Sequence, residues 1–139
     1  MNLAQERELL KQAFEAFKAE NAKELRDKAK ALVYVPEAAT YDLAIMFYSH
    51  LNSPGSKFFP QEKFYGECVL GQLYFMVTDE SSDRDLVVRA LREAQDHFDQ
   101  AYVMSESLPG SDSEVVELIK KKYVAAENII NGVNMFFRL

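Results

Sequence analysis

The stretch LGQLYF, residues Leu70 to Phe75, places a glycine in the middle of a segment that otherwise has the composition of a long apolar helix. A glycine inside a helix costs about 1 kcal/mol relative to alanine, so the missing side chain must bring a gain elsewhere. We expect Gly71 to allow the close approach of a partner helix, at Ala94 or Ala101 of the next helix along the chain. The stretch therefore predicts helix-on-helix packing, and it identifies neither a reaction nor a partner.

The bulk composition predicts a single all-α domain over residues 1–139. The chain is 48% hydrophobic and 27% charged, which is ordinary for a globular protein, and its length allows a core without cross-links. Five glycines and four prolines are few for a sheet-rich fold, and no alternating apolar run is long enough for a strand. The single cysteine, Cys68, excludes an intramolecular disulfide and favours a reducing compartment.

Apolar spacing and helix-start signals divide the chain into five or six helices. Pro36 and Pro60 each suit a first helical turn, and Ser82 with Asp85 resembles a helix cap. Because the connections are short, we expect consecutive helices to pack as antiparallel hairpins. The expected helices cover 2–33, either unbroken or split near Asn21, then about 36–51, 60–78, 83–105, and 113 to near the end.

The charge balance and the apolar runs exclude two classes of partner. The net charge is −6, whereas binding to nucleic acid requires a basic surface, so we expect no nucleic-acid partner. No stretch approaches the ~20 apolar residues that a membrane span needs. The first residues are amphipathic and include acids, which does not suit a signal peptide, so we expect a cytoplasmic location.

Two segments share a spacing of small and aromatic residues. They are YDLAIMFYSHLNSP at 41–54 and REAQDHFDQAYVMSESLP at 92–109. In each, a small residue is followed four positions later by an aromatic residue and seven positions later by an apolar one. A small residue lets a neighbouring helix approach, and the aromatic side chain fills the adjacent space. The matching residues are Ala44, Tyr48 and Leu51 in the first segment, and Ala94, Phe98 and Ala101 in the second.

Together with LGQLYF, these residues resemble the tetratricopeptide repeat, most clearly over residues 64–109. That family pairs a helix A carrying Leu-Gly-x-x-Tyr with a helix B carrying Ala-x3-Phe-x2-Ala. The first element is matched by Leu70, Gly71 and Tyr74, and the second by the segment that contains Phe98. The alternative is a different helical bundle whose core packing has the same pattern.

The resemblance implies a fold of helical hairpins and a role in binding proteins, as an adaptor or a small chaperone. In the family, helix A lines a concave groove that holds a peptide. Some relatives hold a terminal carboxylate there with Lys and Asn, whereas this chain has Cys68 and Gln72. We therefore expect an apolar or helical guest segment. The partner-binding residues that the resemblance implies are Tyr65, Cys68, Gln72, Phe75 and Met76.

The sequence contains no pattern that is typical of an enzyme, a metal site or a cofactor site. His50 and His97 are the only histidines, and neither belongs to a metal-binding motif. Glu93 and His97 are four residues apart on one expected helix, which suits a surface ion pair. We expect Cys68 to be a buried, unreactive thiol because its helix is apolar. We accordingly expect no catalytic residue, no metal and no cofactor.

Aromatic residues are concentrated before residue 76, and the last helix is broadly apolar. Ten of the 17 aromatic residues fall between Tyr34 and Phe75, either buried between neighbouring helices or lining a groove. The last helix carries two adjacent apolar stripes. The first consists of Ile119, Tyr123, Ala126, Ile130, Val133 and Phe137, and the second of Ala125, Ile129 and Phe136. We expect Ile129 and Phe136 to support self-association, as in a homodimer, unless the first helix covers them. A bundle that binds an apolar small molecule and a homo-oligomeric structural protein stay as alternative functions.

Overall fold

The computed structural model describes residues 1–108 and 112–137, with the side chains of Phe136 and Phe137 outside that description. Within this part of the chain every regular element is an α-helix, which confirms the all-α prediction. The helices are α1 (Leu3–Lys18), α2 (Ala22–Val33), α3 (Thr40–Leu51), α4 (Pro60–Glu80), α5 (Arg84–Ser107) and α6 (Ser113–Phe137).

The first 33 residues form two helices, which settles the choice that the sequence left open. The Asn21 side chain accepts a hydrogen bond from the Glu24 N–H at 3.1 Å and caps α2. Glu20, directly before this cap, has a φ of 54°, so the chain turns sharply between α1 and α2.

Two helix starts differ from the prediction. α3 begins at Thr40 and not near Pro36, because the Thr40 hydroxyl donates to the Glu80 carboxylate at 2.5 Å and fixes the first turn beside the end of α4. α5 is capped by Asp83 and not by Ser82. The Asp83 carboxylate accepts from the Asp85 N–H at 3.1 Å, since an aspartate at this position reaches the free N–H groups of the first turn.

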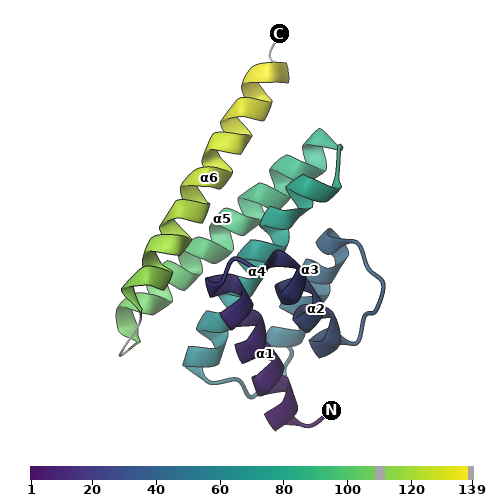
Figure 1. Cartoon of the computed structure of the whole chain (residues 1–139), viewed down its shortest axis with the longest axis vertical. Helices are drawn as coiled ribbons and strands as arrows, with labels where there is room; N and C mark the ends of the chain where they lie inside the picture. The colour runs from purple at the N-terminus through teal and green to yellow at the C-terminus, as the bar shows by residue number, and fades with distance from the viewer. Residues whose placement is uncertain (109–111, 138–139) are drawn as a thin grey trace.

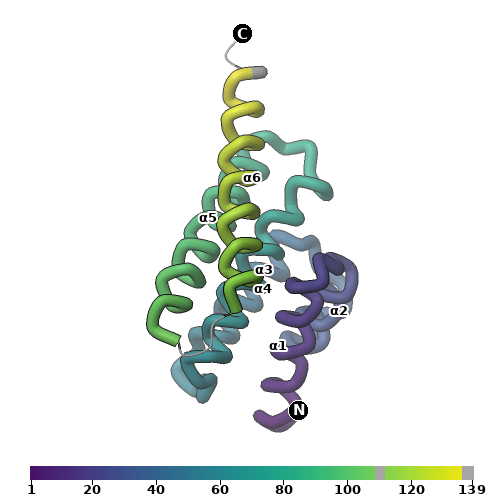
Figure 2. Tube along the Cα trace, turned by 60° about the vertical axis from the view of Figure 1, so that its left-hand side comes forward, coloured from purple at the N-terminus to yellow at the C-terminus, as the bar shows by residue number. Residues whose placement is uncertain are grey.

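Helix α4 lies at the centre of the molecule, and α6 lies on the outside (Figure 1). α4 packs against α5, α3 and α1, whereas α6 packs chiefly against α5. In Figure 1, α6 follows α5 on the side away from α2 and α3, and in Figures 1 and 2 its C-terminal end projects past the other helices. The consecutive pairs α1–α2, α3–α4 and α5–α6 are in contact, as expected for hairpins.

Gly71 is a close-approach site. A Cβ atom built at Gly71 would lie 2.5 Å from the Phe98 ring of α5, so no side chain fits there without displacement. The prediction of close packing against the next helix is confirmed. The contact differs from the prediction, because the nearest atoms to Gly71 belong to the ring of Phe98 and not to Ala94 or Ala101.

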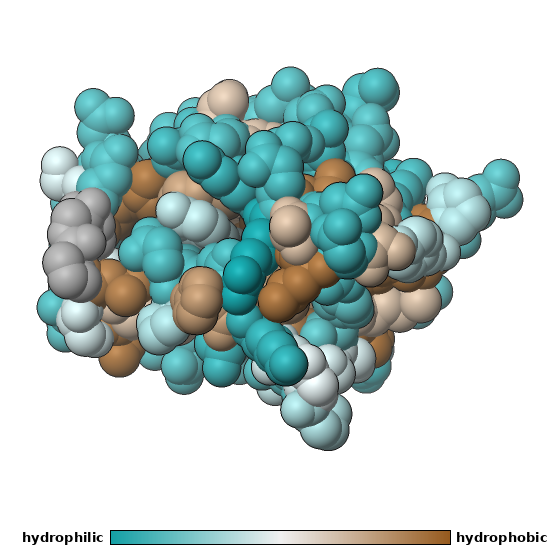
Figure 3. Space-filling view, turned by 90° about the horizontal axis from the view of Figure 1, so that it is seen from below, coloured by the Kyte–Doolittle hydropathy of each residue, from teal (hydrophilic) through white to brown (hydrophobic). Residues whose placement is uncertain are grey.

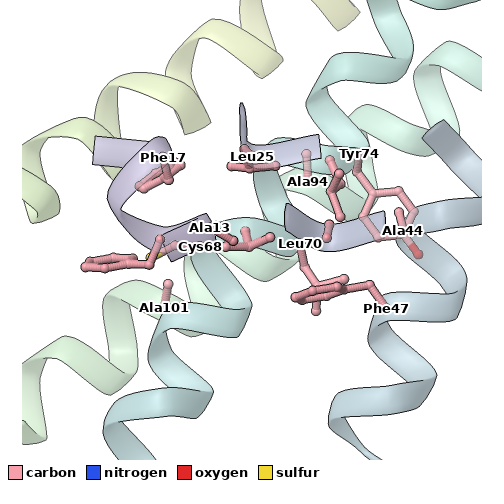
Figure 4. Close-up of a cluster of buried hydrophobic side chains, with 14 of the residues drawn as sticks. Ala13, Phe17, Leu25, Ala44, Phe47, Cys68, Leu70, Tyr74, Ala94 and Ala101 are labelled. Atoms are coloured by element: carbon pink, nitrogen blue, oxygen red, sulfur yellow. The ribbon is translucent and has the colours of Figure 1, made fainter. Parts of the chain in front are cut away.

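The main core joins the first five helices and reaches α6. Figure 4 shows Ala13 and Phe17 of α1 beside Cys68 of α4 and Ala101 of α5. A smaller cluster joins α5 to α6, and Phe75 of α4 packs against both clusters. The smaller cluster contains Val87, Leu91, Ala126 and Ile130.

Candidate functional site

The face of α4 that the repeat resemblance assigned to a groove is covered by neighbouring helices, by α1 at Tyr65 and by α6 at Phe75. The Tyr65 ring stacks on the Phe14 ring of α1, with 4.1 Å between centroids and 21° between planes. Cys68, Gln72 and Met76 are buried, and Cys68 has no exposed surface. The expectation of an open groove along these residues is therefore corrected: neighbouring helices occupy that space.

On this face of α4, the Phe75 ring contacts a lysine of α6 and the Gln72 side chain has an unbonded oxygen. The Lys122 ammonium of α6 lies 5.4 Å from the centroid of the Phe75 ring, and it also pairs with Glu20 at 3.6 Å. Lys122 thus holds α6 against α4 and the end of α1. The Oε1 atom of Gln72 is buried and accepts no hydrogen bond from the described residues.

The loop between α3 and α4 is fastened to α1 and does not close a cavity. Phe58 is buried in the main core, whereas Phe59 stays on the surface. The Arg7 guanidinium lies 4.3 Å from the centroid of the Phe59 ring and pairs with Glu62 at 3.1 Å. A lid over a ligand would need both phenylalanines inserted, so this loop gives no support to the small-molecule alternative.

An apolar groove runs between α5 and α6 and encloses about 340 Å³. Phe98 and Ile119 form its floor, and both are almost completely buried. Tyr123 and Val124 form the α6 rim and are 40% and 55% exposed. The groove therefore combines a buried apolar floor with an accessible apolar rim, which is the arrangement of a contact site.

Polar side chains border this groove on both sides. Asp99 of α5 and Lys120 of α6 line it, and the Lys120 ammonium lies 5.3 Å from the centroid of the Tyr102 ring. Seen from the end that carries the α5–α6 connection, apolar side chains form separate patches divided by hydrophilic ones (Figure 3). The apolar floor of the groove is thus a local feature with a polar border.

The two apolar stripes predicted for the last helix differ in how deeply they are buried. Ala126 and Ile130 of the first stripe are buried against α5. Ile129 of the second stripe is half-buried against the same cluster, so it is part of the α5–α6 contact. The side chain of Phe136 lies outside the described residues.

A second pocket, which we call the tyrosine pocket, lies between α3, α4 and α5 and encloses about 430 Å³. Tyr41 meets Tyr74 edge to face, with 5.8 Å between ring centroids. The Tyr74 ring stacks on His97 at 5.5 Å, and Tyr48 lies at the same centroid distance from His97. The lining residues are Tyr41, Ile45, Tyr48, Tyr74, Glu93, Asp96 and His97.

His97 is buried at this pocket, so its predicted pairing with Glu93 is present but is not on the surface, and a second carboxylate lies closer. Its Nδ1 atom lies 2.6 Å from the Glu67 carboxylate, whereas Glu93 is 4.0 Å from Nε2. A carboxylate only accepts, so Nδ1–H is the donor to Glu67. This bond and the stacking on Tyr74 together fix the orientation of the imidazole ring.

Sequence reasoning did not identify the tyrosine pocket, although a signal was present. Tyr41, Ile45 and Tyr48 follow one helix face at the spacing i, i+4, i+7, which places them in a row. The concentration of aromatic residues was recognised. The contribution of α5 to the same pocket depends on the tertiary packing of α3 against α4 and α4 against α5.

Comparisons with known proteins give no match to this chain among family models, curated proteins or solved structures. None of the helices in residues 1–108 and 112–137 combines the length and the apolarity needed to cross a membrane.

Proposed function

We propose that the protein is a non-enzymatic protein–protein interaction module, an adaptor or small chaperone, that holds an apolar or helical segment of a partner. The supporting observation is the groove between α5 and α6, where an apolar floor meets the accessible side chains of Tyr123 and Val124. Aromatic rims of this kind provide a large contact area at low entropic cost.

The shape of the groove favours a helical segment over a small molecule. Sites for small molecules bury most of their ligand, whereas the α6 rim of this groove is 40% to 55% exposed. A third helix laid along α5 and α6 would pack its side chains between theirs, as helices do within a bundle. Asp99 and Lys120 at the border offer both signs of charge to polar residues of the guest.

The resemblance to tetratricopeptide repeats adds an expectation of the same kind, namely peptide binding by a helical hairpin. The proposed surface lies on α5 and α6 because the corresponding face of α4 is covered by α1 and α6. A cytoplasmic location is part of the proposal, and the lone, buried Cys68 is compatible with it.

The test uses a fluorescent amphipathic peptide with leucines at i, i+3, i+4 and i+7, and a scrambled peptide of equal composition. We expect anisotropy to show saturable binding of the first peptide only. Val124→Asp should weaken it about tenfold, the effect of losing one contributing contact. Val103→Asp is the matched control, since Val103 is 53% exposed on α5 but does not line the groove. Equal binding of the scrambled peptide, or equal effects of the two variants, would contradict the proposal.

A homodimer through α6 is a second candidate, favoured by the projection of the C-terminal end of α6 past the other helices (Figure 1). Met135 near that end is exposed, and a Cβ atom at Gly132 would meet no atom within 4 Å. Sedimentation velocity over a range of concentrations tests it. We expect Met135→Ser, at an exposed position, to shift the protein toward monomer while circular dichroism stays unchanged. Ile129 is not used for this test because it belongs to the α5–α6 contact.

A further inference from the structure

The tyrosine pocket contains a phenol whose hydrogen-bonding capacity is unused. Tyr74 is 5% exposed and lines the pocket, yet its hydroxyl makes no hydrogen bond to any described residue. The hydroxyl oxygen itself is not fully enclosed: it is open to the pocket, where a hydrogen-bond partner can reach it. A group that enters the pocket would supply that partner.

Carboxylates are the charged side chains that dominate the surroundings of the pocket, and its one basic lining residue is His97. Glu93 and Asp96 line it, and neither forms an ion pair with a lysine or arginine among the described residues. Glu67 stands behind His97 as its hydrogen-bond acceptor. No lysine or arginine is among the lining residues. Apart from the His97 imidazole, which is bonded to Glu67 and lies 4.0 Å from Glu93, the polar groups of the lining are acceptors and hydroxyls.

The aromatic rings of the pocket also favour a positively charged guest. Aromatic faces carry negative potential and attract cations, and Tyr41 and Tyr48 stand at the α3 side of the opening. Burial first, with smaller effects of Glu93, Tyr41 and Tyr48, raises the pKa of Tyr74 to about 12. The phenol therefore keeps its proton at neutral pH and presents a neutral hydroxyl to a guest.

We propose that the tyrosine pocket binds an arginine side chain of a partner polypeptide. The planar guanidinium stacks on aromatic rings, is weakly hydrated and has five N–H donors. Those donors suit the Tyr74 hydroxyl and the carboxylates of Glu93 and Asp96 together, whereas a lysine ammonium offers a point charge without a planar face. This site is separate from the α5–α6 groove, and it holds whether or not the groove binds a helical segment.

The experiment titrates isotope-labelled protein with N-acetyl-arginine amide and follows the amide and tyrosine ring signals by NMR. The citrulline counterpart has nearly the same shape without charge, and the lysine counterpart has the charge without the planar group. We expect the arginine probe to shift the signals of Tyr41, Tyr48 and Tyr74 and to bind about tenfold or more tightly than citrulline. Equal binding of citrulline would overturn the proposal, and lysine binding as tight as arginine would overturn the choice of a guanidinium.

Variants locate the binding in the pocket. Glu93→Gln with Asp96→Asn should weaken the arginine probe about tenfold or more. Asp99→Asn with Glu106→Gln removes the same charge from α5 outside this pocket and should change the affinity by less than about twofold. Tyr48→Ser, at an exposed position that folding tolerates, should also weaken binding. Equal losses in both charge pairs, or none with Tyr48→Ser, would show that the probe binds elsewhere.

Discussion

Helix α4 is enclosed by α1, α3 and α5, whereas α6 packs chiefly along α5. Both helices are apolar over more than one face, but only α4 has each of these faces covered by another helix in the part of the chain that the structure describes. The second face of α4 is closed by Phe14, which stacks on Tyr65. The outer face of α6 keeps Tyr123 and Val124 accessible. The comparison teaches that a broad apolar surface shows how many neighbours a helix needs, and that the chain itself supplies them for α4 alone.

The largest expected effect concerns access to Cys68 on the enclosed helix. Burial, and secondly the carboxylate of Glu67, raise the pKa of the Cys68 thiol, so little reactive thiolate forms. We expect a thiol reagent to modify native protein on the order of a thousandfold more slowly than protein in urea. The measurement is the rate of labelling followed by mass spectrometry. Rapid labelling of the native protein would mean that α1 does not cover α4, and the groove expected from the repeat resemblance would return.

The next effect contrasts a glycine on each helix. Gly71→Leu should lower the free energy of unfolding by about 1–3 kcal/mol, because the new side chain enters the space of the Phe98 ring. Gly132→Ala of α6 meets no atom within 4 Å and should instead stabilise the helix by about 0.5–1 kcal/mol. Urea titrations measure both values. A neutral Gly71→Leu variant would contradict the close approach of α4 and α5.

These two glycines also show how far the sequence determines the fold. The helix-forming pattern and the cost of Gly71 were enough to predict the α4–α5 contact, because local spacing sets which face each residue occupies. The cover over Tyr65, Cys68 and Met76 could not be predicted. It depends on where α1 docks, which is set by contacts between residues that lie about fifty positions apart in the chain.

The tyrosine pocket could not be predicted from the sequence either, because it is formed by residues of three different helices. The sequence assigns Tyr74 to the Leu-Gly-x-x-Tyr element of one helix, whereas in the structure its neighbours in the pocket come from α3 and from α5. The closer partner of His97 is Glu67 of α4, at 2.6 Å, whereas Glu93, four residues before it on α5, is 4.0 Å away. The spacing of residues within one helix does not predict contacts between helices of this kind.

A smaller effect is the pH dependence of stability that the buried Tyr74 of α4 produces. The pKa of Tyr74 is raised to about 12 in the folded protein, against about 10 in the unfolded chain. The folded state therefore holds this proton to higher pH, and stability falls as the pH rises from about 10 to about 12, by at most about 1.4 kcal/mol per pH unit. Urea titrations across this range measure the slope. Tyr74→Phe should reduce it, and an unchanged slope in this variant would mean that Tyr74 is not the group responsible.

The smallest expected effect is on the outer face of α6. Val124→Ser should change the free energy of unfolding by less than about 0.5 kcal/mol, because a side chain that is 55% exposed buries little surface on folding. Ile130 on the opposite face is fully buried, and Ile130→Ala should cost about 2–5 kcal/mol in the same titration. Urea titrations at two protein concentrations test the pair. A cost at Val124 that approaches that of Ile130 would mean that this face is covered. If that cost grew with protein concentration, the cover would be a second copy of the chain, because only an association equilibrium makes stability depend on concentration.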